Sequence, residues 1–335
     1  MFEARPASRL FLDSHGWAGV DPVPLAGDAS FRHYFRLTDG KRRAVLMDAP
    51  PPREDVRPFA AVAAHLAALG LSAPRVIAKD THGGFLLLED LGDETYTRAL
   101  AAGADEASLY ALATDTLIAL HRHPAQRKVD VPAYDDAVLD REASLLVDWF
   151  LPAWRGAATP DGIVRDYLAA WRRVYPHARV GSPVLVLRDY HVDNLVRLPG
   201  RGGIAACGLL DFQDALIGSR AYDLASLVED ARRDVDPAVA RSCVERYLAA
   251  FPDVPPDAFR TAMTVLAAQR NAKIVGIFVR LARRDGKPQY LKHIPRVWRL
   301  LAGNLAHPAL AELRDWFDEH VPAAWRTAPE FEDAR

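Results

Sequence analysis

Leu187-Arg188-Asp189-Tyr190-His191-Val192-Asp193-Asn194 is the stretch of this 335-residue sequence that decides the fold. Apolar runs rich in branched residues lie on both sides of it, at 182–187 and 195–198, and each is short enough for a buried strand. A Gly- and Pro-rich turn follows, and a further apolar run at 204–210 ends at Asp211-Phe212-Gln213. The predicted order is therefore strand, polar loop, strand, turn and strand, with a second acidic position at the end.

Three side chains of this region have the chemistry that phosphoryl transfer requires. Asp189 can accept the proton of an attacking hydroxyl, while Asn194 and Asp211 offer the hard oxygen ligands that Mg²⁺ prefers. Asp and Asn are also common in turns and helix caps, so the pattern alone is weak. The strands predicted around it supply the context and favour a metal-dependent phosphotransferase of the protein-kinase-like type.

This order of elements predicts an α+β, protein-kinase-like fold with two lobes. The length exceeds what one hydrophobic core usually supports, which also favours two parts. We expect a small N-terminal lobe over residues 1–91, with an antiparallel sheet that binds the nucleotide. A larger, mainly helical C-terminal lobe over residues 92–335 would hold the catalytic loop, the metal site and the binding site of the acceptor.

Composition and charge argue against several other classes of protein. The formal net charge of −2 gives no electrostatic basis for binding nucleic acid. The N-terminus lacks a secretory signal and no apolar run reaches the ~18–20 residues of a membrane helix, so we expect a cytoplasmic protein without membrane contact. Cys207 and Cys243 lie in no metal-ligand spacing, which predicts two buried thiols. The sequence does not define the oligomeric state, and a monomer is compatible with it.

The N-terminal region supplies candidate contacts to the phosphates. A turn around Gly27 and Ser30 precedes an alternating strand, and its small residues would let backbone N–H groups approach a nucleotide closely. Arg32 would add positive charge there. A plain hairpin turn explains the same segment, because it contains one glycine rather than a glycine-rich motif.

A lysine that protein kinases place on their third strand is missing here. Leu46 or Met47 occupies that position in the strand predicted at 43–48, and the helix predicted at 56–69 lacks a clear glutamate partner. Both halves of the usual ion pair are thus expected to be absent. The phosphate charge would then be met by Arg32 or chiefly by Mg²⁺.

A hairpin predicted at 75–80 and 85–92 leads out of the small lobe. In this position the main chains of Glu89 and Leu91 are candidates to bind the adenine ring of ATP, although a simple edge strand and turn would look similar. The sequence does not distinguish ATP from GTP.

Two features of the predicted helical lobe bear on the acceptor. In the helix expected at 257–284, Arg270 and Lys273 belong to a stripe of cations that would bind an anionic substrate group or form a solvated face. Asp223, near the start of another predicted helix, is expected to cap that helix or to brace the catalytic loop.

The chain resembles the aminoglycoside phosphotransferase-like small-molecule kinases over nearly its whole length. The resemblance rests on Asp189, Asn194 and Asp211 and on the predicted order of the two lobes. Leu187 departs from the His that this family usually has before its catalytic Asp. That His is mainly a structural support, so the change concerns the rigidity of the loop.

More narrowly, several phrases are similar to bacterial amino-sugar kinases of cell-wall recycling. These phrases are Gly27-Asp28-Ala29-Ser30-Phe31-Arg32, Met47-Asp48-Ala49-Pro50-Pro51, Arg188-Asp189-Tyr190-His191, Asp211-Phe212-Gln213-Asp214-Ala215 and Gln269-Arg270-Asn271-Ala272-Lys273.

The resemblance implies transfer of phosphate from ATP, with Mg²⁺, to the anomeric hydroxyl of N-acetylmuramate or N-acetylglucosamine. It makes Arg188, His191, Gln213 and Asp214 candidate sugar contacts, with Arg270 or Lys273 on the lactyl carboxylate of a muramate. An aminoglycoside, choline or homoserine-like kinase of the same fold is the first alternative, and would line its acceptor cleft with carboxylates when the acceptor is a polycation. A non-catalytic nucleotide-binding protein is the second, supported by the missing lysine.

Overall fold

The computed structural model describes residues 4–25 and 31–331, and the chain divides into two compact units. The first consists of Met1–Val131 and Val192–Ala215, and the second of Pro132–His191 and Leu216–Arg335. The predicted lobe boundary at residue 91 stays a prediction. In the described part of the chain, no helix is both long and apolar enough to cross a membrane.

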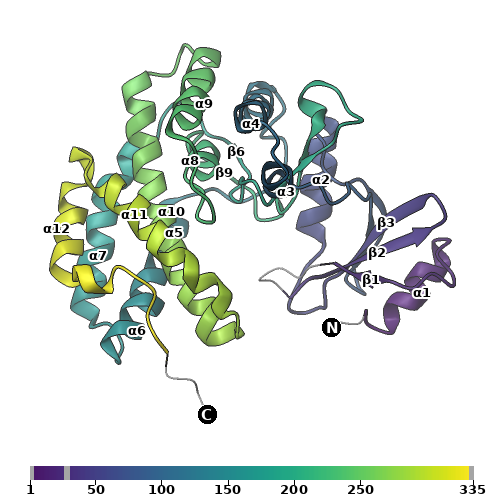
Figure 1. Cartoon of the computed structure of the whole chain (residues 1–335), viewed down its shortest axis with the longest axis horizontal. Coiled ribbons are helices and arrows are strands. Elements are labelled where there is room, and N and C mark those ends of the chain that lie inside the picture. Colours follow the sequence, from purple (N-terminus) through teal and green to yellow (C-terminus); the bar gives the residue numbers. More distant parts are fainter. Residues whose placement is uncertain (1–3, 26–30, 332–335) are drawn as a thin grey trace. The chain divides into compact units, whose positions relative to one another are not determined.

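The first unit contains a five-stranded antiparallel sheet in the order β1-β2-β3-β5-β4, which confirms the predicted N-terminal sheet. Its strands are β1 (Val23–Pro24), β2 (His33–Asp39), β3 (Arg42–Asp48), β4 (Val76–Asp80) and β5 (Phe85–Leu88). Side chains alternate along each strand. One face, including Phe35, Leu46 and Leu87, packs with Phe11 of α1 (Ala7–Ser14), as Figure 1 shows for the helix beside the sheet. Tyr34, Arg36 and Val45 belong to the other face.

Helices and a small hairpin complete this unit. The helices are α2 (Arg57–Ala68), α3 (Tyr96–Ala101) and α4 (Glu106–Arg122), and the hairpin pairs β7 (Leu195–Arg197) with β8 (Cys207–Leu209). Asp105 caps α4 by accepting the Ser108 N–H at 2.8 Å. The strand predicted at 204–210 is half wrong, because Gly203–Ala206 forms a 3₁₀ turn and only the following residues pair.

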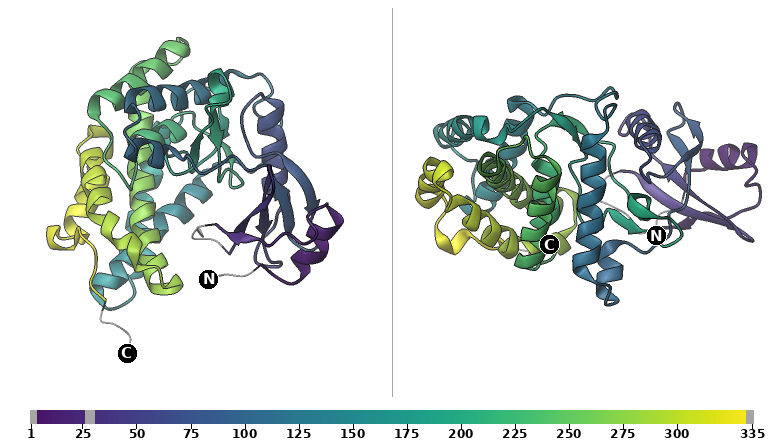
Figure 2. Two further views of the ribbon diagram at one scale, coloured as in Figure 1. Left: turned by 45° about the vertical axis from the view of Figure 1, so that its right-hand side comes forward. Right: turned by 90° about the horizontal axis from the view of Figure 1, so that it is seen from above.

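The second unit is mainly helical and is organised around α10 (Pro256–Asp285), close to the predicted helix. Around it lie the α-helices α5 (Asp136–Leu145), α6 (Leu151–Arg155), α7 (Asp161–Val174), α8 (Tyr222–Val228), α9 (Pro237–Ala250), α11 (Ile294–Leu305) and α12 (Ala311–His320). Figures 1 and 2 show α10 running among the other helices, and it contacts α5, α8 and α11. At Gly276 a Cβ would lie 2.2 Å from the Leu145 carbonyl oxygen, so glycine permits the close approach of α10 to the end of α5.

A short strand pair in the second unit delivers the predicted catalytic segment. β6 (Val184–Val186) pairs with β9 (Leu216–Gly218), and its three residues are buried. This confirms a strand before Asp189, shorter than the predicted run. Both cysteines are buried, as predicted.

Candidate active site

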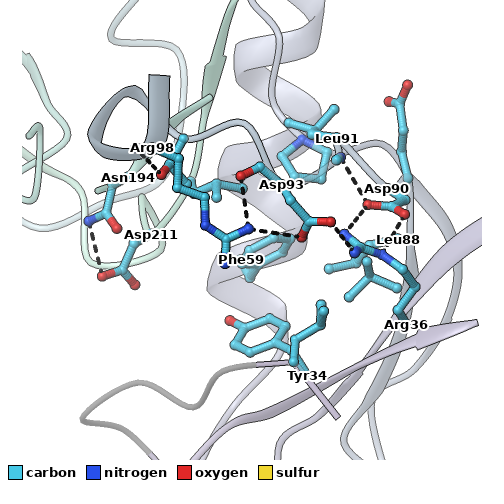
Figure 3. A pocket seen from close by; sticks show the side chains of 17 residues that line it. Tyr34, Arg36, Phe59, Leu88, Asp90, Leu91, Asp93, Arg98, Asn194 and Asp211 are labelled. Carbon is cyan, nitrogen blue, oxygen red and sulfur yellow. Dashed lines mark hydrogen bonds and ion pairs between the residues drawn. The ribbon is translucent and has the colours of Figure 1, made fainter. Parts of the chain in front are cut away.

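A cavity of about 340 Å³ lies in the first unit, on the sheet face opposite α1. Leu25, Val45, Leu88 and Leu210 give it apolar walls, and the segment from Glu89 to Asp93 forms one side (Figure 3). Asn194 and Asp211 lie at another side. Apolar walls with a few polar groups and a volume in this range are typical of small-molecule sites.

The chain after β5 lines this cavity, and the side chain of its first residue is held by two arginines. The Glu89 carboxylate contacts Arg201 at 2.7 Å and Arg75 at 3.2 Å. The Glu89 N–H donates to the Arg75 carbonyl at 2.9 Å, which ties this residue to the chain before β4. Leu91, two residues later, also lines the cavity. The predicted adenine contacts at these two residues are therefore compatible with the structure, and they stay a prediction.

The two predicted metal ligands lie together within the first unit. Asn194 precedes β7 and Asp211 follows β8, and antiparallel pairing of Leu195 with Leu209 brings these ends together. The Leu210 N–H also donates to the Asn194 carbonyl at 2.9 Å. As a result the Asn194 amide nitrogen lies 3.5 Å from Asp211 Oδ2 (Figure 3). A side-chain carbonyl and a carboxylate at this separation fit the oxygen ligation of Mg²⁺ once the amide turns its oxygen inward.

Asp211 is held in an unusual conformation by its neighbours. Its φ is 57°, in the left-handed region that non-glycine residues rarely occupy. Gln213, predicted to face the sugar, is buried and donates to Asp211 Oδ1 at 2.7 Å and to Asp214 at 3.3 Å. Phe212 packs on Phe59 of α2, with ring centroids 4.9 Å apart. Gln213 thus braces Asp211, the predicted metal ligand, while Asp214 is exposed.

Arg32 lies near Asp211, the predicted metal ligand, and supplies positive charge on this side. Its guanidinium is 3.9 Å from Asp211 Oδ1 and 3.7 Å from Glu54, although its side chain is only 11% exposed. Burial opposes the charged form, but Tyr34, Asp211 and Glu54 outweigh it and raise the pKa of Arg32. The Arg32–Glu54 pair is an acid–base pair that the sequence did not reveal. Gly27 and Ser30 lie outside the described residues.

In the second unit, Asp189 follows β6 and is half-buried. The chain before it is held by Asp223 of α8, which accepts the N–H groups of Leu187 at 2.7 Å and Arg188 at 2.8 Å. This confirms the bracing role expected for Asp223. Burial raises the pKa of Asp223 to about 7, against the effect of these two backbone donors. Arg188 itself has a φ of 70°, a second strained position, immediately before the predicted base.

A buried cluster around Glu142 of α5 holds two of the predicted sugar contacts. Glu142 pairs with Arg188, accepts from the Tyr134 hydroxyl and lies 2.9 Å from the Lys273 ammonium. Burial opposes its charge, but Lys273 and Arg188 outweigh this and lower the pKa of Glu142 to about 2. Gln269 also donates to it at 3.3 Å. Lys273 is 8% exposed, so this cation is engaged within the protein rather than on a solvated face.

The remaining predicted acceptor contacts in this unit are His191 and Arg270. His191 is buried, and burial, then Arg232 and Arg270, hold its pKa well below the ordinary value, which keeps the ring neutral at neutral pH. Arg232 Nη1 lies 3.4 Å from His191 Nε2. Arg270 is 4% exposed and donates to the Glu229 carbonyl at 3.3 Å. Their role toward a sugar stays a prediction.

Two side chains that can offer oxygen ligands at the rim of a cavity, with a carboxylate five residues before one of them in the sequence, are typical of nucleotide-dependent phosphotransferases of the protein-kinase-like fold. Solved structures share this fold. Choline kinase LicA from Streptococcus pneumoniae matches with a TM-score of 0.65 and 11% identity, over 90% of this chain and 98% of that one. A choline/ethanolamine kinase family protein from Mesorhizobium loti matches with a TM-score of 0.63 and 14% identity, over 92% of this chain and 97% of that one.

The chain belongs to the phosphotransferase enzyme family (APH), whose model matches residues 21–259. It is similar to the N-acetylmuramate/N-acetylglucosamine kinase of Caulobacter vibrioides, with 38% identity over 97% of this chain and 98% of the relative. It is also similar to the kinase of the same name from Pseudomonas aeruginosa, with 42% identity over 91% of this chain and 90% of the relative. These findings confirm the predicted family.

Proposed function

We propose that this protein transfers the γ-phosphate of ATP to the anomeric hydroxyl of N-acetylmuramate or N-acetylglucosamine, with Mg²⁺, as a step in peptidoglycan recycling. The observation that carries the proposal is the pair Asn194 and Asp211, 3.5 Å apart at the rim of a cavity of nucleotide-compatible size. The names of relatives that match nearly the whole chain support the acceptor. ATP dependence favours the cytoplasm as the place of the reaction.

In this proposal the nucleotide base lies in the first-unit cavity, with its edge on the Glu89 carbonyl and the Leu91 N–H. Mg²⁺ bound by Asn194 and Asp211 would neutralise charge on the phosphate oxygens. Arg32 would add charge beside them, in place of the missing lysine. Because its partners already include Asp211, Arg32 would also orient that carboxylate.

Asp189 would orient the C1 hydroxyl and accept its proton. The sugar oxygen forms the new bond to the γ-phosphorus while the bond from that phosphorus to the β,γ-bridging oxygen breaks, which releases ADP. A hemiacetal hydroxyl is more acidic than an ordinary alcohol, so it requires less of its base. Two carboxylates hold Arg188, the residue before Asp189. Asp223 accepts its backbone N–H, and Glu142 pairs with its guanidinium.

The test is ATP consumption by the purified protein with Mg²⁺ and, separately, N-acetylmuramate, N-acetylglucosamine, kanamycin, choline or no acceptor. Phosphorus NMR of the product should show a sugar 1-phosphate that acid hydrolyses. Turnover with kanamycin or choline alone would reassign the acceptor. Asp189→Asn should lose about 10²–10⁴-fold in kcat and still bind ATP; ATP binding by the unmutated protein without turnover on any acceptor would favour a non-catalytic role.

A further inference from the structure

A basic side chain, Arg36, lies in the sheet wall of the nucleotide cavity, among aliphatic residues and Tyr34. The register of the sheet places Arg36 of β2 opposite Val45 of β3, and Val45 opposite Leu88 of β5. All three side chains line the cavity, so the guanidinium of Arg36 lies next to the apolar side chains of Val45 and Leu88. A charged group in such a wall needs partners, and its position needs a reason beyond packing.

Two carboxylates lie close to the guanidinium of Arg36, and two of its nitrogens donate hydrogen bonds to them. Its Nε lies 2.8 Å from Asp90 Oδ2, Nη2 donates to Asp90 Oδ1 at 2.9 Å, and Nη1 donates to Asp93 at 2.5 Å. Asp90 is 3% exposed and also accepts the Gly92 N–H at 2.9 Å, which fixes it to the chain after β5. A guanidinium that donates from its terminal nitrogens can still stack a flat face on a ligand.

The position of Arg36 argues against a role in binding the phosphates. Figure 3 shows Arg36 and Asp90 on one side of the cavity and Asp211 with Asn194 on the other. The phosphates must lie near the metal ligands, so the opposite end, beside the chain from Glu89 to Leu91, is left for the base. Guanidinium planes stack on aromatic faces, and such contacts strengthen when water is excluded.

We propose that Arg36 is a stacking platform for the nucleobase, held flat by Asp90 and Asp93 while the main chain after β5 binds the edge of the base. This inference rests on the proposed function, because it specifies how the same site recognises a purine nucleotide. It makes Arg36 a specificity-determining residue, and the two aspartates the residues that position it.

The test compares the affinities of two ligands, ATP and inorganic tripolyphosphate, each with Mg²⁺, by isothermal titration calorimetry. Arg36→Leu and Arg36→Lys should both weaken ATP binding about tenfold or more, since base stacking contributes on that scale. Binding of tripolyphosphate, which has no base, should stay within about twofold in both variants. Lysine retains the charge but not the plane, so it should behave like leucine.

Arg43→Leu is the matched control, because Arg43 is an exposed arginine on the same strand face as Val45, outside the cavity. It removes an equal charge and should leave both affinities within about twofold. Asp93→Asn loosens the platform without removing it and should weaken ATP binding less than Arg36→Leu. If Arg36→Leu does not fold, the comparison of ATP with tripolyphosphate is made on Arg36→Lys and Asp93→Asn instead.

ATP binding by Arg36→Lys at the level of the unmutated protein would overturn the platform, because charge alone would then suffice. So would an equal loss of both ligands, which would indicate a phosphate contact or a general loss of structure. No ATP binding by the unmutated protein would refute the proposed function and the platform together. ATP binding that depends on Arg36, without turnover of either amino sugar, would refute the acceptor assignment only.

Discussion

Replacing Glu142 by glutamine removes the carboxylate that Lys273 and Arg188 share inside the second unit. The side chains of Glu142, Lys273 and Arg188 are only 8%, 10% and 20% exposed, so water compensates little for the lost negative charge. Removing one partner of a buried ion pair costs about 3–5 kcal/mol, because the remaining charge stays buried. We expect Glu142→Gln to lower the free energy of unfolding by that amount.

Urea denaturation followed by fluorescence measures this change, and thermal melting should show a decrease of roughly 6–20 °C in a protein of this size. Lys273→Met should partly restore stability in the Glu142→Gln background, because it removes one of the two uncompensated cations. The contribution of Glu142 should persist above its ordinary pKa of 4.5 and be lost as the pH falls toward its folded value of about 2.

Glu312→Gln is the matched control in the same unit. Glu312 pairs with Arg173 at a similarly short distance, but the two side chains are 60% and 56% exposed. Such surface pairs contribute about 0–1 kcal/mol. If Glu142→Gln destabilises the protein no more than Glu312→Gln does, the argument from burial is wrong and the cluster is not a structural element of the catalytic segment.

Three further predictions concern the charged groups of the site. Asp223 has a folded pKa of about 7 against an ordinary 3.8, so its contribution to stability is complete below pH ~4 and lost as the pH rises to ~7. Asp223→Asn leaves Asp189 and Arg270 as charged neighbours and should reduce the loss of unfolding free energy between pH 5 and pH 8, measured by urea titration. An unchanged loss would show that Asp223 is not the group responsible. Arg32→Leu should raise the KM for ATP about tenfold and leave the KM for the sugar unchanged, since a charged hydrogen bond is lost only from the phosphates. Asp211→Asn should reduce kcat 10²-fold or more and abolish the added thermal stability that Mg²⁺ with ATP gives the unmutated protein; retention of both would exclude Asp211 as the ligand.

The proximity of Asn194 and Asp211, the predicted metal ligands, could be foreseen from the sequence because it depends on local elements. Asn194 and Asp211 flank two apolar runs joined by a turn, and antiparallel pairing of those runs brings the ends of a hairpin together. The place of Asp223 at the start of a helix predicted that it would accept backbone N–H groups. Which backbone groups it would accept depended on tertiary contacts, since Leu187 lies 36 residues away in sequence.

The parts that the sequence did not predict depend on long-range partners. Glu142 was missed, although it falls within an apolar stripe of α5 that includes Leu139, Ala143 and Leu146, and a charge at such a position signals a buried pair. Arg32 and Glu54 were not recognised as a pair, because neither stands on the strand or helix where kinases usually place these charges. Arg36 was missed because strand alternation identifies its face but not what that face meets.

Buried carboxylates hold the main chain at both candidate ligand segments, and their substitution should therefore act on function indirectly. Asp223 accepts two backbone N–H groups before Asp189, and Asp90 accepts the Gly92 N–H beside the cavity. Neither carboxylate needs to touch a substrate for its loss to matter, because each fixes the groups that do. Substitution of Asp223 should lower kcat through the position of Asp189, whereas substitution of Asp90 should act on nucleotide affinity. The two effects belong to separate steps, so their free energies should add in the double variant.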